Sequence, residues 1–169
     1  MENEQNINPQ EEIENTISQE DLQREMEQLK MQQNLPFGII AGLVAALVMA
    51  LLWAVITVIT EYQIGYMAIA VGFCVGFAVR FAGKGIDKIF GIIGAALAFL
   101  GCILGNFFSQ IAFAADYLGA SYTDMLSIVF AEPSLIQALM VESFSPIDVL
   151  FYGIAIYAGY RYSFREIAA

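Results

Sequence analysis

The stretch WAVITVITEYQIGYMAIAVGFCVGFAVRFAGKG (residues 53–85) decides how this chain folds. It contains two uncharged apolar runs, separated by the short polar group EYQ at 61–63. The second run ends at Arg80, Lys84 and a Gly-Lys-Gly sequence. This pattern is typical of two antiparallel helices joined by a tight turn, both of them in an apolar environment. It therefore predicts a helical hairpin within a membrane.

Apolar runs of the same kind make up most of the remaining chain. Hydrophobic residues are 59% of the 169 and charged residues only 14%, whereas about 25% are charged in an average soluble domain. A helix over 37–60, which has no charge, is long enough to cross a hydrocarbon core of about 30 Å. We predict an all-α, polytopic integral membrane protein with a four-helix membrane domain at 36–166. The predicted spans are 37–60, 64–82, 89–115 and 146–162. The last begins with a cap, a first-turn proline and a first-turn acid at Ser145, Pro146 and Asp148.

Small residues recur at helical spacing within these runs. Faces of Gly and Ala let two membrane helices approach closely. The glycines predicted to pack helices together are Gly38, Gly42, Gly72, Gly76, Gly94, Gly101, Gly105 and Gly159. Packing within one bundle is the first interpretation. The alternative is that one such face, most plausibly the one from Gly38 to Ala54, binds a partner or a second copy of the chain.

Two segments lie outside the predicted spans. The segment 116–144 has apolar residues at helical spacing and no base, which predicts two short amphipathic helices on the outer face; a re-entrant hairpin is the alternative. The N-terminal segment 1–35 holds nine acidic and two basic residues, a net charge of −7. We predict a mostly disordered tail with a short helix near 18–33, capped by its first residue, a serine. That helix is either a marginal juxtamembrane helix or a short coiled-coil seam that pairs two copies.

The basic residues predict the orientation of the chain. Arg24 and Lys30 precede the first span, and no base lies between the first and second spans or between the third and fourth. The remaining bases, which we take as topology anchors, are Arg80, Lys84, Lys88, Arg161 and Arg165. With four spans all seven bases fall on one side, and the positive-inside rule makes that side the cytoplasm. Both termini are expected there. Arg80 either extends to the headgroups or pairs with Asp87.

Two stretches resemble a group of bacterial four-helix membrane proteins whose function is uncharacterised. They are ITVITEYQIGYMAIAVGFCVGFAVRFAGKGIDKIFGIIGAALAFLGCILGN (56–106) and SFSPIDVLFYGIAIYAGYRYSFR (143–165). The resemblance extends over roughly 36–166 and leaves out the acidic tail. It implies four spanning helices in a bacterial inner membrane. It implies no activity, substrate or catalytic residue.

Polar groups within membrane helices are costly and often functional. Those expected to gather toward the outer side are Thr57, Thr60, Glu61, Gln63, Asn106, Ser109, Gln110 and Asp148. One interpretation is a polar vestibule whose charges are Glu61 and Asp148. The other, which we favour, is that the amides and hydroxyls bridge helices while the acids cap helix ends.

Several function classes are disfavoured by residue types alone. There is no His to activate a Ser or Cys, no paired intramembrane acid and no basic patch for nucleic acid. No cofactor or metal site is predicted. We expect a non-enzymatic inner-membrane protein that acts through helix–helix or tail-mediated contacts, with the bilayer and a second copy or another protein as partners. The alternative is a small transporter or channel for a cation or small solute, because the outer segments carry acids and no base.

Overall fold

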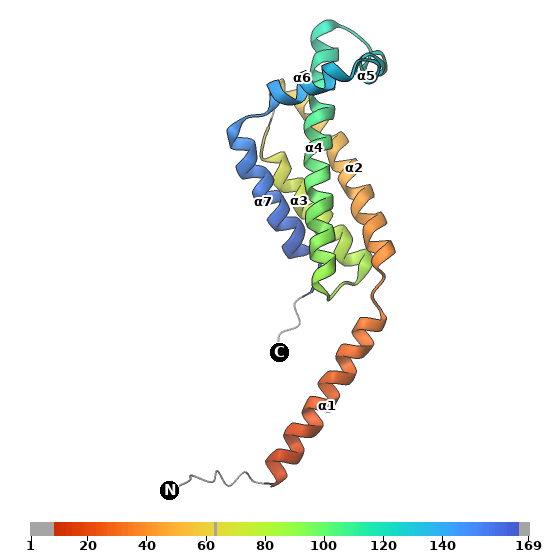
Figure 1. Cartoon of the computed structure of the whole chain (residues 1–169), viewed down its shortest axis with the longest axis vertical. Helices are drawn as coiled ribbons and strands as arrows, with labels where there is room; N and C mark the ends of the chain where they lie inside the picture. The colour runs from red at the N-terminus through yellow and green to blue at the C-terminus, as the bar shows by residue number, and fades with distance from the viewer. Residues whose placement is uncertain (1–8, 63, 166–169) are drawn as a thin grey trace. The chain divides into compact units, whose positions relative to one another are not determined.

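A computed structural model of the chain describes residues 9–62 and 64–165. Within these residues it is all-α, with seven helices and no strand (Figure 1). The helices are α1 (Pro9–Met31), α2 (Leu35–Thr60), α3 (Met67–Gly83), α4 (Lys88–Leu118), α5 (Tyr122–Ala131), α6 (Pro133–Ser143) and α7 (Pro146–Tyr162). They belong to two compact units, Met1–Gln33 and Asn34–Ala169.

The first unit contains α1. This helix begins at Pro9, nine residues before Ser18, where the sequence analysis placed its start. Proline is favoured in the first turn because its missing N–H has no partner there, and the glutamates and glutamines that follow are good helix formers. Ser18 therefore lies inside a longer helix and does not cap its start.

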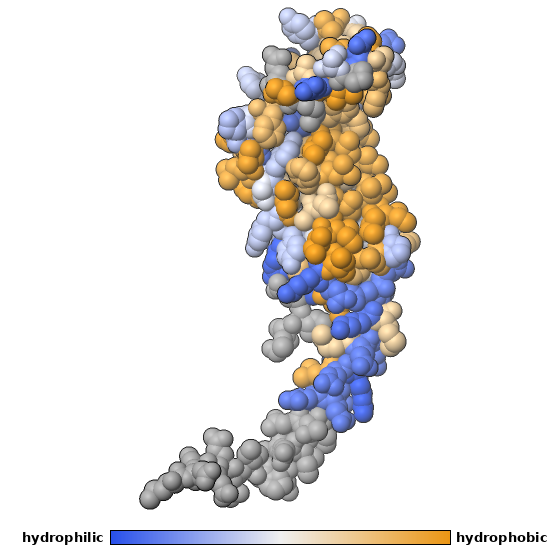
Figure 2. Space-filling view, viewed as in Figure 1, coloured by the Kyte–Doolittle hydropathy of each residue, from blue (hydrophilic) through white to orange (hydrophobic). Residues whose placement is uncertain are grey.

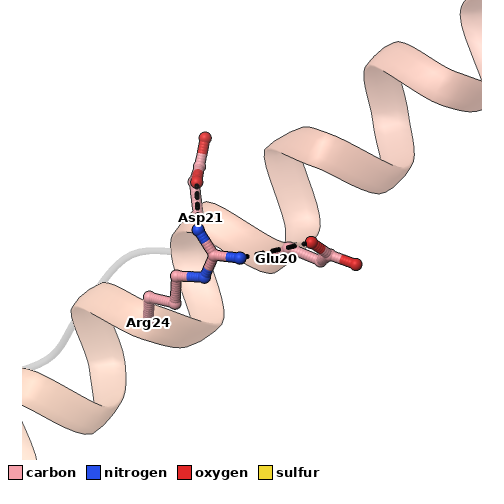
Figure 3. A network of polar contacts seen from close by, with 3 residues as sticks. All are labelled: Glu20, Asp21 and Arg24. Carbon is pink, nitrogen blue, oxygen red and sulfur yellow. Dashed lines mark ion pairs between the residues drawn. The ribbon is translucent and has the colours of Figure 1, made fainter.

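One basic residue of α1 pairs with two acids of the preceding turn. The guanidinium of Arg24 lies 3.6 Å from the carboxylate of Glu20 and 3.8 Å from that of Asp21 (Figure 3). Their spacings of four and three residues place the two acids next to Arg24 on one face of the helix. All three side chains are exposed, so each pair contributes at most about 0.5 kcal/mol to helix stability.

In the second unit, α2, α3, α4 and α7 pack against one another as a bundle (Figure 1). Among the described residues, α2 with 26 residues and α4 with 31 are long and apolar enough to cross a membrane. The helices α3 and α7 have 17 residues each. The predicted span 146–162 matches α7, and 37–60 differs from α2 only by two residues at its start.

Two helices differ by three residues at one end from the predicted spans. The helix expected from Ile64 begins at Met67, because 64–66 form a turn in which the Met67 N–H donates to the Ile64 carbonyl (3.1 Å). The helix expected to end at 115 continues to Leu118. It ends at Gly119, whose φ of 61° is a left-handed cap conformation that glycine adopts without strain. The charge at Asp116 therefore does not end the helix, whereas the glycine does.

The packing of α2 is inverted relative to a soluble helix. Its buried positions are mostly small residues, including Gly38, Gly42, Ala46, Ala50 and Ala54. Its large apolar residues face outward, for example Ile40 and Val55. Figure 2 shows hydrophobic side chains covering the visible flank of the bundle, with hydrophilic residues gathered toward its ends.

The helices α5 and α6 pack on one end of α4 and on each other. We call this end, where α2 ends and α7 begins, the capped end of the bundle. A second apolar cluster holds the two short helices there, with Phe107 and Ile111 of α4 against Met125 and Val129 of α5. The prediction of two short helices within 116–144 is confirmed.

Candidate functional site: buried polar groups at the capped end

The polar residues predicted to form one cluster do not all lie together. Gln63 is outside the described residues. Thr57, Asn106, Ser109 and Asp148 are buried, and Gln110, one turn beyond Asn106 on α4, is half-buried. The structure therefore has buried polar contacts between helices, and separately it has exposed groups at the end of α2.

The first buried contact joins α2 to α4. The Thr57 hydroxyl donates to the Ser109 hydroxyl over 3.2 Å. The two side chains are only 2% and 0% exposed. An unpaired hydroxyl in an apolar interior is costly, so each residue satisfies the other.

The second contact joins α4 to α7. The Asn106 side-chain amide donates to the phenolic oxygen of Tyr152 (3.2 Å), and the Tyr152 hydroxyl donates to the Cys102 carbonyl (3.3 Å). The tyrosine ring is held by edge-on contacts with Phe99 and Phe144. Tyr152 was not among the residues predicted to form the cluster. A usable signal existed, because Tyr152 lies four residues after Asp148 and so shares its face of the helix.

Asp148 has a structural role at the start of α7. Its carboxylate accepts a hydrogen bond from the Ser145 N–H (2.8 Å), as in a capping box. Although it is a carboxylate, the residue is only 8% exposed. It lies beside Gly65 in the turn between α2 and α3, where a Cβ would be 3.4 Å from its oxygen. The cap predicted from Ser145, Pro146 and Asp148 is thus present, and it holds the acid inside the bundle.

Thr60 and Glu61 are exposed and belong to the end of α2. The Thr60 hydroxyl donates back to the Ile56 carbonyl (2.7 Å), a local contact within the helix. Glu61 is the C-cap, with φ of 56°. A non-glycine residue in this left-handed region is strained by roughly 1 kcal/mol. These two residues end the helix and face solvent rather than joining the buried contacts.

Trp53, one turn before Thr57 on α2, is the largest fully buried side chain, with 1% exposure. The benzo edge of its indole packs on Gly105 of α4, where a Cβ would lie 2.5 Å from the ring. Within the part of the chain that the structure describes, the indole N–H has no hydrogen-bond partner. The glycine at 105 is therefore required by the tryptophan.

Two grooves open on the bundle surface, and both are lined by apolar and aromatic side chains. The first, of about 490 Å³, lies along α2 from Leu51 to Ile59 and reaches Ala112 and Tyr122. Burial raises the pKa of the Tyr122 hydroxyl above its ordinary value. The second, of about 450 Å³, lies between α4 and α7 with Tyr152 in its wall. Neither has the acidic and amide lining of the predicted vestibule.

The predicted packing glycines lie at helix crossings. Gly38 and Gly42 of α2 face α3 and α4, Gly101 of α4 faces α3 and α2, and Gly105 of α4 faces α2. Gly72 and Gly76 of α3 face α7, as does Gly94 of α4, which meets Gly159. The small-residue face of α2 from Gly38 to Ala54 is therefore buried inside the chain's own bundle.

The predicted anchors lie at the other end of the bundle. We call this the basic end; it contains the loop 84–87 between α3 and α4 and the end of α7. Arg80 and Arg161 are half-buried, and the anchors that are exposed are Lys84, Lys88 and Arg165. The loop is fixed by main-chain hydrogen bonds on both sides, from the Asn34 N–H to the Gly83 carbonyl (2.9 Å) and from the Arg165 N–H to the Gly85 carbonyl (2.9 Å).

Comparisons with protein-family models, with curated proteins and with solved structures each found no match. Among the described residues, no three His, Cys, Asp or Glu side chains are grouped so as to hold a metal ion. The arrangement at the capped end can therefore be interpreted only from its own chemistry, which is that of neutral hydrogen bonds between helices.

Proposed function

We propose that the chain is an integral membrane protein in which α2, α3, α4 and α7 each cross the bilayer. The observation that carries the proposal is the inverted packing, with Gly and Ala inside and large apolar side chains outside. On α7, for example, Val149 and Leu150 are about as exposed as Ile40 on α2. Soluble monomers rarely expose continuous apolar surface beyond a few hundred Å². Lipid tails are as apolar as these side chains, so exposing the same surface to a bilayer carries no such cost.

The distribution of charge supports an orientation with both termini in the cytoplasm. Five bases lie at the basic end, whereas 60–66 and 116–148, which form the capped end, contain none. Positive charge is retained on the cytoplasmic side of membrane proteins. A bacterial inner membrane and an uncharacterised four-helix family follow from the resemblance of 56–106 and 143–165, and they are part of the same proposal.

Within that membrane the proposed role is non-enzymatic, through contacts made by helices or by the acidic tail. The buried polar groups support it, because Thr57 pairs with Ser109 and Asn106 with Tyr152. Such pairs hold helices together and expose no reactive group. The tail is the stronger candidate for partner contact, since α1 belongs to a separate compact unit and its side chains from Gln19 onward are mostly exposed.

A transporter or channel for a cation or small solute is the second candidate. One observation favours it: the capped end carries Glu61, Asp116, Asp124 and Glu132, all exposed, and no base. A surface of one sign concentrates counter-ions. The paired state of the buried hydroxyls and amides counts against a continuous polar path.

Cysteine labelling tests the membrane proposal. In a background with Cys74→Ala and Cys102→Ala, Ser121→Cys should react with a membrane-impermeant maleimide on intact cells, and Lys88→Cys only after permeabilisation. Equal labelling of both positions on intact cells, or release of the protein by alkaline carbonate, would overturn the four-span arrangement.

Ion flux in proteoliposomes that is lost with Glu61→Gln would instead support transport. Deletion of 1–33 should change the set of crosslinked proteins if the tail binds a partner.

A further inference from the structure

An exposed row of aromatic rings follows the contact between α3 and α7. Phe73, Phe77 and Phe81 are spaced by four on α3, and their rings are nearly parallel, with centroids 6.5 and 6.1 Å apart and interplanar angles of 24° and 26°. Tyr162 of α7 packs against the first two, with centroid distances of 4.8 and 5.2 Å. We call these four rings the aromatic stripe. It ends at Phe81, which is 69% exposed.

Basic residues gather where the stripe ends. Gly76 of α3 contacts the last turn of α7, and its Cβ position would be 3.0 Å from Cβ of Tyr162. Arg80 is one turn further along α3, rotated by about 40° from Gly76 toward the stripe. Arg80 therefore lies between the end of α7 and Phe81.

Two more bases are held at this point by the main chain. Lys84 caps α3, its N–H donating to the Arg80 carbonyl (2.9 Å). Arg165, just beyond α7, is fixed to the same loop by its hydrogen bond to the Gly85 carbonyl (2.9 Å). Arg161 precedes it in the last turn of α7. Two acids are close in sequence to these bases, Asp87 in the loop and Glu166 next to Arg165, against the four bases Arg80, Lys84, Arg161 and Arg165.

We propose that the aromatic stripe and these bases together bind an anionic phospholipid. The phosphate group is held by Arg80, Lys84 and Arg165, because guanidinium and ammonium groups are the usual ligands of phosphate oxygens. One acyl chain lies along the stripe, because its nearly parallel rings form a continuous apolar surface that leads to the bases. An acidic protein would satisfy the bases but not the rings, and a zwitterionic lipid would satisfy the rings but leave the positive charge without a net counter-charge. This inference rests on the proposed membrane insertion.

Lipid retention by the full-length protein tests the proposal. The protein is reconstituted in equimolar phosphatidylglycerol and phosphatidylcholine with identical acyl chains, extracted in mild detergent, and its bound lipid measured by mass spectrometry. The wild type should retain the anionic lipid about tenfold over the zwitterionic one. The preference should disappear with Arg80→Gln, Lys84→Gln and Arg165→Gln combined. It should persist with the matched control Arg24→Gln and Lys30→Gln, which removes bases from α1 instead.

Further measurements make the outcome independent of how well the triple variant inserts. For the wild type alone, 1 M NaCl shortens the screening length to about 3 Å and should abolish most of the preference. Phe77→Ala with Phe81→Ala should lower retention of the long-chain anionic lipid, and glycerol 3-phosphate, which has no chain, should fail to displace that lipid. Equal retention of both lipids by the wild type, or displacement by glycerol 3-phosphate, would overturn the proposal. Loss of lipid preference together with the expected cysteine labelling would reject only this site and leave the four-span arrangement standing.

Discussion

Gly94 of α4 and Gly159 of α7 face each other so closely that a Cβ on Gly159 would lie 2.6 Å from the Gly94 carbonyl oxygen. Real Cβ atoms do not approach to this distance, and the atom met is main chain, which cannot rotate away. The two helices are thus in contact through their backbones. In a membrane, apolar side chains gain little by leaving lipid for another helix, because lipid tails are equally apolar. Close packing of backbones at small residues is therefore an important source of helix association there.

The first prediction follows from that crossing. Gly159→Ala should destabilise the bundle by about 1–3 kcal/mol, because the helices must move apart. Gly153→Ala, on the same helix, is the matched control, since nothing lies within 4 Å of its Cβ position. It should be neutral or stabilising by up to about 1 kcal/mol through helix propensity. Equilibrium unfolding in mixed micelles measures both, and equal effects of the two substitutions would contradict the crossing.

The second prediction concerns the contact between α4 and α7. Tyr152→Phe removes the hydroxyl that links Asn106 to the Cys102 carbonyl. Hydrogen bonds between membrane helices contribute about 0.6 kcal/mol on average and at most about 1.7, so the same unfolding measurement should show a loss in that range. Tyr157→Phe, at an exposed position of the same helix, should change the free energy of unfolding by less. The reverse order would show that the buried hydroxyl is not a structural link.

The third prediction uses Trp53, the only tryptophan of the chain. Because no partner for its N–H lies among the described residues, Trp53→Phe removes no hydrogen bond to them and leaves only a modest loss of packing. Trp53→Ala creates a cavity beside Gly105 and should cost about 3–5 kcal/mol. The fluorescence of the wild type should also resist quenching by aqueous iodide. Strong quenching would place the indole at a water-accessible position.

The fourth prediction separates strain from charge at Glu61. Its φ of 56° favours glycine, so Glu61→Gly should stabilise the fold by about 1 kcal/mol. Glu61→Gln keeps the strain and removes the charge, so its stability should match that of the wild type. If Glu61 contributes to ion flux, both substitutions reduce flux despite their different stabilities. A loss of flux in Glu61→Gly alone would trace the effect to the backbone rather than to the carboxylate.

The sequence predicted those features that depend on local pattern. The start of α7 was predicted because a cap, a proline and an acid at Ser145, Pro146 and Asp148 act within one turn. The hairpin of α2 and α3 was predicted because two uncharged apolar runs on either side of a short polar turn are typical of antiparallel helices. Features that depend on how helices rotate against one another were not predicted. The contacts of Ser109 with Thr57 and of Asn106 with Tyr152 depend on tertiary packing. The periodicity of the sequence does not determine them.

Boundaries were missed where two local signals competed. At the end of α4 the predicted span stopped at 115, before Asp116, but the unstrained left-handed conformation of Gly119 sets the end of the helix. At the start of α1 the serine cap at Ser18 was a weaker signal than Pro9. In the candidate site, Glu61 and Asp148 both cap helix ends, as the favoured interpretation stated, but Glu61 is exposed whereas Asp148 is buried. Exposure is a property of the fold, and residue type does not reveal it.

The hydrogen bonds from Asn34 to Gly83 and from Arg165 to Gly85 have a consequence for the course of the chain. The polypeptide enters the bundle beside Gly83, the last residue of α3, and leaves it beside Gly85, two residues further on. A few extended residues could therefore join the two points. A brief linker from residue 165 back to 34 would therefore close the bundle into a ring. New ends opened at the exposed residues Gly119 and Ala120 would yield a circularly permuted second unit that lacks α1, keeps α2 to α7 intact, and has its termini at the capped end instead of the basic end.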